Sequence, residues 1–257
     1  MNLIKQGYIS HTIGGFNFIK ALELEPITDY NQPAIIFGLY NDMDWNVIAK
    51  LKSNVTILWG GGDVLKFQQH KQKLITGDRF RHITPCTSNV VNLKEKGIDC
   101  EIVPMFSSAI DYLKPIEKKD KIYSYIPPSN PNYYNKPMVD QLNLGDKLLI
   151  GLGPKTGGPN QNQWSNGEAL KYYSQCFLGL FLCEGAGGGL GIVEMGLCGI
   201  KVITNVLEAP HTIPWKTKED ILNIIKSEEK SIGTTNVELA NQVREWMSNN
   251  EQWLKMP

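Results

Sequence analysis

Short apolar runs alternate with amphipathic stretches along most of the chain. Apolar runs rich in β-branched residues predict buried strands, and apolar positions repeating every three to four residues predict helices. In the first half, this pattern predicts strands at residues 34–39, 55–59, 81–85 and 100–104 and helices at residues 45–51 and 88–96. The second helix is expected to be N-capped by Ser88 and closed by Gly97. No strand is evident before Gly14.

The second half repeats the alternation after a charged interruption. Residues 113–121 are polar and contain a proline, which indicates a solvated linker between a domain at 1–117 and a domain at 118–257. Beyond it we expect strands at residues 122–126, 147–151, 178–183 and 202–204, and helices at residues 133–142, 167–175, 190–197, 217–227 and 237–254. The last helix is expected to pack back across the domains. Alternating strands and helices predict an α/β protein of two small Rossmann-like parallel-sheet domains that face each other across a cleft.

Composition narrows the class of partner. The 257 residues are 42% hydrophobic and carry 26 basic against 26 acidic side chains, which supports a sizeable core and argues against nucleic acid as a partner. The five cysteines form no CxxC pair and the four histidines are scattered, so we expect no metal site. The N-terminus lacks the apolar region of a signal peptide and no apolar run is long enough to span a bilayer, so we expect a cytoplasmic protein. The oligomeric state stays open.

The stretch with the most chemical content follows the expected strand at residues 178–183. Five of the eight residues after Cys183 are glycine, and a helix is expected next. Glycines let a backbone approach a ligand closely, and free amides at a helix start attract anions, so Gly187, Gly188, Gly189 and Leu190 predict a pyrophosphate site. Glu194, about one turn into the helix, could accept hydrogen bonds from a ribose diol. The alternative is a glycine-rich turn with solvated glutamates at positions 184 and 194.

Several further side chains are candidates with plainer alternatives. A second glycine turn, with Gly153 and Lys155, follows an expected strand as in dinucleotide-binding proteins, although it lacks the full GxGxxG pattern. The polar loop after it, residues 160–166, could contact a nucleobase or be an exposed loop. His11, before Gly14 and Gly15, could act as a general base or bind the transferred sugar, or it could be a solvated histidine. Asp63, after a glycine triplet, could contact an acceptor hydroxyl or close a turn. His211 and Trp215 could border the site, although such a tryptophan more often packs in the core.

Taken in order, these segments resemble the retaining glycosyltransferases of the GT-B fold. Glu184 followed by GLGIVEMGLCGIKVIT is similar to the E…GxGLxxxEAxxxGxPV signature of that family, and LIGLGP at residues 149–154 resembles its IxGxGP strand. Residues 87–104 resemble the last helix and strand of its N-terminal domain, and LWGGGD at residues 58–63 resembles its WHGxD strand end. Gly14 and Gly15 correspond to its N-terminal glycine loop. The family separates its two glutamates by seven residues, whereas nine separate Glu184 from Glu194.

The resemblance implies an enzyme of carbohydrate biosynthesis that transfers a sugar from a nucleotide-diphosphate donor to a hydroxyl acceptor such as a glycan, with retention and without a metal. It assigns the donor to the C-terminal domain and the acceptor to the N-terminal domain. Glu184, His11 and Asp63 are then the candidate catalytic residues, and the nucleotide sugar is a co-substrate, so no cofactor is expected. Lys136 and Lys155 are the candidates for the basic residues that face the diphosphate. A nucleotide-sugar epimerase and a non-catalytic nucleotide- or glycan-binding protein remain as alternatives.

Overall fold

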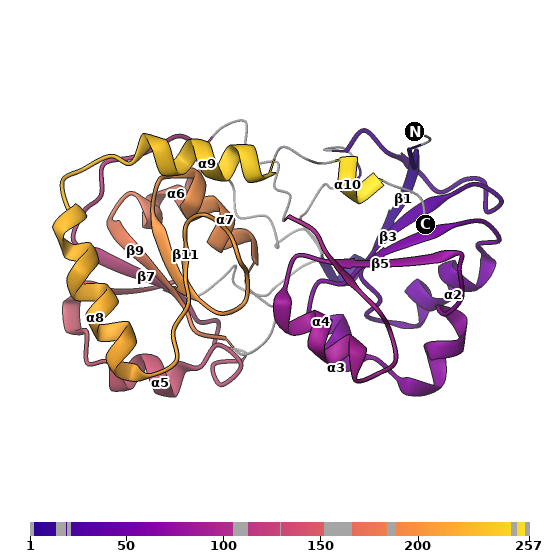
Figure 1. Ribbon diagram of the computed structural model, residues 1–257, viewed down its shortest axis with the longest axis horizontal. Coiled ribbons are helices and arrows are strands. Elements are labelled where there is room, and N and C mark those ends of the chain that lie inside the picture. The colour runs from indigo at the N-terminus through magenta and orange to yellow at the C-terminus, as the bar shows by residue number, and fades with distance from the viewer. Residues whose placement is uncertain are drawn as a thin grey trace. The chain divides into compact units, whose positions relative to one another are not determined.

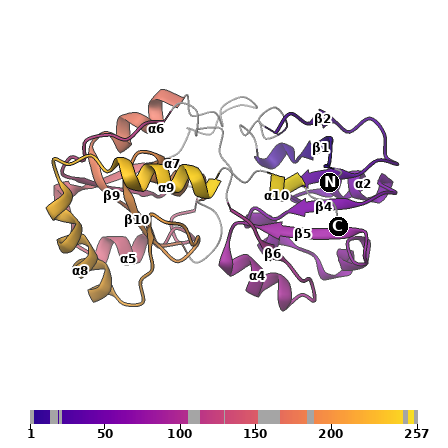
Figure 2. The same cartoon turned by 45° about the horizontal axis from the view of Figure 1, so that its top comes forward.

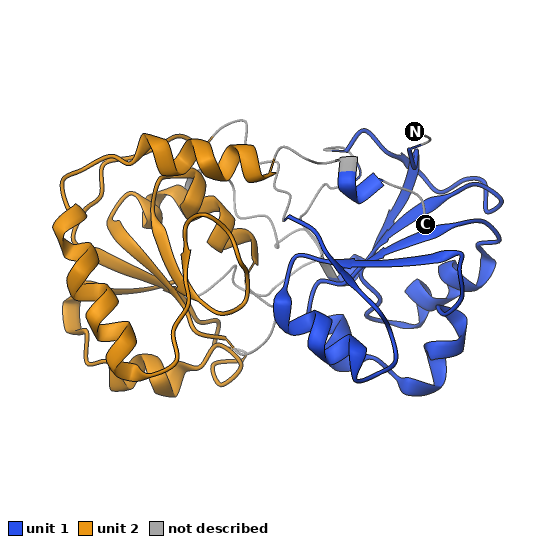
Figure 3. Cartoon of the chain, in the orientation of Figure 1, with its two compact units in different colours: residues 1–108, 249–257 blue, residues 109–248 orange. Residues whose placement is uncertain are grey.

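The computed structural model describes residues 3–13, 19, 22–104, 113–128, 130–151, 166–183, 189–247 and 251–254. The chain divides into two units, which are coloured separately in Figure 3. Unit 1 contains Met1–Ser108 together with Asn249–Pro257, and unit 2 contains Ala109–Ser248. The division predicted from the sequence, between residues 117 and 118, falls nine residues later than this one.

Unit 1 is built on a parallel sheet with the strand order β2-β1-β3-β4-β5-β6. Its strands are β1 (Gln6–Ile9), β2 (Glu25–Pro26), β3 (Ala34–Phe37), β4 (Val55–Leu58), β5 (Phe80–Thr84) and β6 (Glu101–Ile102). The central strands β3 and β4 are buried along their whole length, because apolar groups cover both faces of the sheet. This requirement explains their continuous apolar sequences, AIIF and VTIL.

Both faces of this sheet carry an apolar layer. One layer includes Trp45 and Ile48 of α2 (Asp42–Lys50), Val64 of α3 (Gly62–Lys66) and Leu93 of α4 (Thr87–Lys94). The other layer includes Trp253 of α10 (Glu251–Leu254), which is 1% exposed and donates its indole Nε1–H to the carbonyl of Pro104 at 2.8 Å. The chain's last helix is therefore part of the core of unit 1 (Figure 1). The described residues of this unit also form the 3-10 helices η1 (His11–Ile13) and η2 (Gln69–Leu74).

Unit 2 has a second parallel sheet, with the strand order β11-β10-β9-β7-β8. The strands are β7 (Lys121–Tyr125), β8 (Leu148–Gly151), β9 (Cys176–Phe181), β10 (Lys201–Thr204) and β11 (Thr212–Ile213). Helices α6 (Asn166–Tyr173), α7 (Gly189–Leu197) and α9 (Val237–Met247) lie on one side, and α5 (Lys136–Gln141) and α8 (Lys218–Glu228) lie on the other (Figures 1 and 2). The part of unit 2 that the structure describes also includes the 3-10 helices η4 (Gly145–Lys147) and η5 (Glu229–Ser231).

Three strands were not predicted from the sequence, namely β1, β2 and β11. The case of β1 is instructive because this strand buries a polar residue. Gln6 is 5% exposed, and its side-chain amide donates to the carbonyls of Asp29 at 2.7 Å and Gln32 at 3.2 Å. A hydrophobicity pattern cannot register a buried glutamine whose donors are satisfied by a distant loop. The strands β2 and β11 have two residues each, too few for any periodicity.

The segment predicted as a solvated linker is instead part of unit 2. Leu113 and Lys118 are each 2% exposed. The backbone N–H of Lys118 donates to the carbonyl of Thr234 at 3.0 Å, and the N–H of Gly233 donates back to the carbonyl of Lys118 at 2.8 Å. These two bonds tie the charged run to the loop before α9, and Lys118 is buried although its neighbours Glu117 and Lys119 are exposed.

Two helix ends also differ from the predictions. Helix α4 begins at Thr87 with Cys86 in the N-cap position, and the hydroxyl of Ser88 is buried without a hydrogen-bond partner among the described residues instead of capping the helix. Gly97 has φ of 71°, as expected for a residue that ends a helix. In place of one C-terminal helix at residues 237–254, the chain has α9 in unit 2 and α10 in unit 1.

Candidate functional site

The strand order of unit 2 reverses at β7. The chain passes from β7 to β8 on one side and then returns to β9 on the other side of β7. In open parallel sheets, ligands bind outside the carboxyl ends of the strands at such a reversal. Here those ends are Tyr125 of β7 and Phe181 of β9.

Helix α7 begins at Gly189, close in sequence to the carboxyl end of β9. The predicted site residues Gly189 and Leu190 are half-buried in its first turn, where backbone N–H groups have no partner within the helix. Glu184, Gly187 and Gly188, as well as Gly153 and Lys155 of the other glycine turn, lie outside the described residues. The described geometry therefore covers the helix start but not the glycine-rich turn before it.

Two glycines inside α7 serve packing. A Cβ added at Gly191 would lie 3.2 Å from Phe181 and 3.4 Å from the hydroxyl of Tyr173. A Cβ added at Gly196 would lie 2.6 Å from the ring of His211. Their lack of a side chain lets the helix lie close to its neighbours, which fixes where its first turn points.

The carboxylate of Glu194 lies in this helix beside buried tyrosines. Its Oε2 accepts a hydrogen bond from the hydroxyl of Tyr173 at 2.9 Å, and the ring of Tyr173 meets that of Tyr123 edge-on at 5.3 Å. Desolvation raises the pKa of Glu194 to about 7, although the hydrogen bond from Tyr173 opposes the rise. Within the described residues no hydrogen bond reaches Oε1. Glu194 is therefore not a solvated surface glutamate.

Aromatic side chains cluster after the carboxyl end of β7, a feature that was not predicted from the sequence. The rings of Tyr125 and Tyr134 meet edge-on at 5.1 Å, and those of Tyr133 and Tyr134 are also 5.1 Å apart. All three are half-buried. The run Tyr133-Tyr134 is the signal that could have indicated an aromatic wall at the strand-order reversal.

Lys136, a predicted partner of the diphosphate, begins α5 and is already paired. Its Nζ donates to both carboxylate oxygens of Asp140, at 2.8 and 2.6 Å. The pair is exposed, and such pairs contribute about 0–1 kcal/mol, so it could open at little cost.

Asp63 is buried in a position that excludes contact with an acceptor substrate. Its side chain is 0% exposed, and both oxygens accept backbone N–H groups. The shortest of these bonds come from Gly61 at 2.7 Å and Val64 at 3.0 Å, and longer ones come from Gly60 and Leu39. Burial raises the pKa of Asp63 to about 6 against the effect of these bonds. Asp63 therefore fastens the glycine turn after β4 to the end of β3.

His11 is exposed in η1, at the carboxyl end of β1, and Gly14 and Gly15 lie outside the described residues. The neighbouring Asp44, to which the sequence prediction gave no role, organises this region. Its carboxylate is 0% exposed and accepts hydrogen bonds from the hydroxyls of Tyr8 and Ser10, each at 2.8 Å, and from the N–H groups of Tyr40 and Asn41. The spacing of Asn41 and Asp44, a capping box at the start of α2, was the available signal.

His211 and Trp215 differ in exposure. His211 is buried against α7, with Nε2 2.9 Å from the carbonyl of Ile192, and burial lowers its pKa to about 4. It therefore does not present a ring to a ligand. Trp215 lines a cavity of about 560 Å³, and its backbone N–H and C=O bond to the side chain of Asn205 at 3.0 and 2.8 Å.

Two kinds of feature are absent from the described residues. They contain no group of three His, Cys, Asp or Glu side chains arranged to hold a metal ion. None of their helices is long and apolar enough to cross a bilayer.

No family model matches the chain, and neither does any curated protein. Among solved structures, the chain is similar to sucrose-phosphate synthase from Thermosynechococcus elongatus, with a TM-score of 0.51 and 12% sequence identity over 84% of this chain and 68% of that one. The likeness shows the fold: the chain is an α/β protein of the GT-B type, built from two Rossmann-like parallel-sheet units, as the sequence predicted.

Proposed function

We propose that this protein is a glycosyltransferase that moves a sugar from a nucleotide-diphosphate donor to a hydroxyl acceptor. The observation that carries the proposal is the arrangement in unit 2. Helix α7 starts at Gly189 beside the strand-order reversal, and the partly desolvated carboxylate of Glu194 lies in the same helix.

Each element has a role in donor binding. The free N–H groups at the start of α7 bind the diphosphate and offset the charge that grows on it as the sugar leaves. Oε1 of Glu194 accepts a ribose hydroxyl, while Tyr173 holds Oε2 in place. Lys155, and Lys136 after release from Asp140, supply positive charge, so the reaction proceeds without a metal. By the family resemblance, Glu184 faces the transferred sugar and the anomeric configuration is retained.

A donor-turnover assay tests the activity. The protein is incubated with nucleotide sugars of several bases, with and without hydroxyl acceptors, and products are analysed by NMR. Free sugar or a glycosylated acceptor of unchanged anomeric configuration supports a retaining transferase. An isomeric nucleotide sugar would indicate an epimerase, and tight binding without turnover would indicate a binding protein.

A pair of glycine variants tests the site. A nucleoside diphosphate at about 100 times its Kd should stabilise the folded protein by roughly 2.7 kcal/mol. Gly189→Val should abolish that gain, because a β-branched side chain at the helix start intrudes on the diphosphate. Gly233→Val is the matched control: Gly233 has φ of 80° and open space around it, so this change strains unit 2 away from the site. Equal nucleotide affinity in both variants would refute the site.

A further inference from the structure

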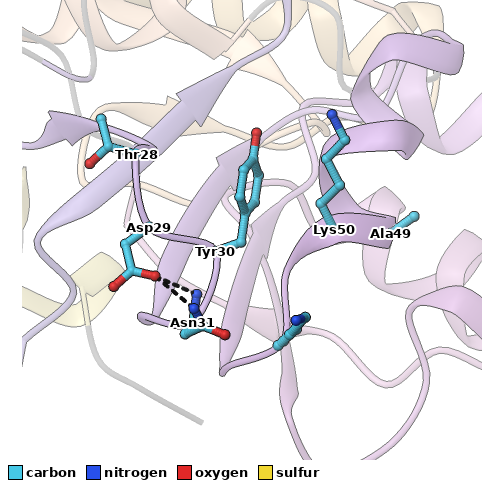
Figure 4. A pocket seen from close by; sticks show the side chains of 7 residues that line it. Thr28, Asp29, Tyr30, Asn31, Ala49 and Lys50 are labelled. Atoms are coloured by element: carbon cyan, nitrogen blue, oxygen red, sulfur yellow. Dashed lines mark hydrogen bonds between the residues drawn. The ribbon is translucent and has the colours of Figure 1, made fainter.

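Unit 1 contains a cavity that the proposed donor site does not use. It has a volume of about 480 Å³ and lies between the loop of residues 28–31 and the end of α2 (Figure 4). The loop precedes β3, which begins at Ala34, and the other wall precedes β4, which begins at Val55. The cavity therefore lies at the amino ends of these strands, whereas His11 follows the carboxyl end of a strand.

Hydrogen bonds from neighbouring segments hold the loop of residues 28–31 in place. Gln6 of β1 donates to the carbonyl of Asp29, and the N–H of Lys52 donates to the carbonyl of Tyr30 at 2.8 Å. The backbone N–H and the side-chain amide of Asn31 both donate to Oδ1 of Asp29, at 2.9 and 3.0 Å (Figure 4). Because these bonds order the loop in the free protein, a ligand does not bear the cost of ordering it.

The lining combines an aromatic ring with positive charge. Tyr30 is half-buried, and the ammonium of Lys50 lies 5.8 Å from the centre of its ring. Lys50 and Lys52 are exposed, and neither forms a salt bridge within the described residues. Asp29 and Asn31 add polar oxygen and nitrogen atoms on the same wall.

We propose that this cavity binds an anionic sugar, that is, a sugar with a carboxylate or phosphate group. The anion pairs with the ammonium groups of Lys50 and Lys52. The apolar face of the sugar ring rests on Tyr30, and its hydroxyls exchange hydrogen bonds with Asp29 and Asn31. The volume falls within the range of small-ligand pockets, roughly 300–1,000 Å³. This site is independent of the proposed transferase activity.

Amide-resolved NMR titration of the whole chain tests the proposal. The probes are glucuronate, glucose 6-phosphate and, as the neutral comparison, glucose. We expect saturable shifts at the amides of Asp29, Tyr30, Asn31 and Lys52, with an anionic sugar binding at least about fivefold more tightly than glucose. Preference for glucuronate or for glucose 6-phosphate identifies which anion the site takes.

Variants separate a built site from general surface charge. The double variant Lys50→Gln/Lys52→Gln should weaken anionic-sugar binding about tenfold or more, and Tyr30→Ala should weaken all three probes. The control is Lys66→Gln/Lys94→Gln, which removes two exposed lysines of unit 1 that do not line the cavity. Equal losses in the two double variants, shifts that map elsewhere, equal affinity for glucose, or no saturable binding would each overturn the proposal.

Discussion

The partly desolvated carboxylate of Glu194 is expected to lower the free energy of unfolding at neutral pH, so replacing this residue should stabilise the protein there. Desolvation raises its pKa from 4.5 to about 7, so the folded state holds a proton more tightly than the unfolded state does. Between these two pH values the unfolded chain loses its proton first, and stability therefore falls as pH rises from about 4.5 to about 7. Above that range the loss is complete and constant.

The size of the effect follows from the shift. At 1.36 kcal/mol per pKa unit the raised value corresponds to about 3 kcal/mol, and the remaining solvent contact of the half-buried side chain reduces our expectation to about 1–2 kcal/mol. Glu194→Gln removes the titrating group but keeps an oxygen that accepts from Tyr173. The variant should therefore be about 1–2 kcal/mol more stable than the parent protein at pH 8 and nearly equal to it at pH 4.5.

Urea unfolding at several pH values measures this difference directly, and nucleotide titration of the same samples measures binding. Under the proposed function, Glu194→Gln gains stability at pH 8 but loses about 1.5–3 kcal/mol of nucleotide binding, because the ribose loses a charged acceptor. Tyr173→Phe is the comparison variant: loss of its hydroxyl removes a bond that favours the ionised form, so the pKa of Glu194 should rise further. A stability difference that does not change between pH 4.5 and pH 8 would refute the assignment of the raised pKa to Glu194.

Three other changes test the packing and burial described above. Asp63→Asn should destabilise the protein by about 1–3 kcal/mol, since its amide would face backbone N–H groups, while Asp78→Asn at an exposed aspartate should have little effect in chemical unfolding. Gly196→Ala should cost about 1–3 kcal/mol through contact with His211, whereas Gly191→Ala should cost clearly less; calorimetry that ranks them in the opposite order would contradict the packing of α7 described above. The buried His82 and His211 have pKa values lowered to about 4, so stability should fall as pH drops from about 6.5 towards 4, and His211→Gln should reduce that acid sensitivity in pH-dependent unfolding.

The strongly apolar elements could be predicted from the sequence, and the polar ones could not. Strands β3 and β4 are recognisable as continuous apolar runs because every residue in them is buried. In contrast, β1 begins with a buried glutamine, and Lys118 is buried although the charged residues beside it, Glu117 and Lys119, are exposed. In both cases hydrogen bonds to a distant loop hold the segment in place, and such a partner is visible only when the chain is folded.

Among the site residues, the sequence indicated chemical types better than environments. It singled out Glu194 as an acceptor, but the surroundings that set the pKa of this residue include Tyr173, which comes from a different helix. It predicted that Asp63 contacts the acceptor substrate because this residue follows a glycine triplet. In the structure, the N–H groups of two of those glycines, Gly60 and Gly61, donate to the Asp63 carboxylate instead. Asp44 received no role, although it gathers four donors from the region of β1 and the start of α2.

The glycines in and around α7 fall into two groups, those needed for close packing and those proposed to contact a ligand. Their density near the end of β9 suggested a phosphate site, but Gly191 and Gly196 are required by the close approach of neighbouring side chains. Gly199, with φ of 78°, ends the helix close to the carbonyl of Asn236, where a Cβ would lie at 2.5 Å. Packing therefore accounts for these glycines within and after the helix, and the proposed diphosphate contact concerns only the glycines at its start. For this reason Gly189→Val, and no substitution further along α7, distinguishes a ligand site from a tightly packed helix.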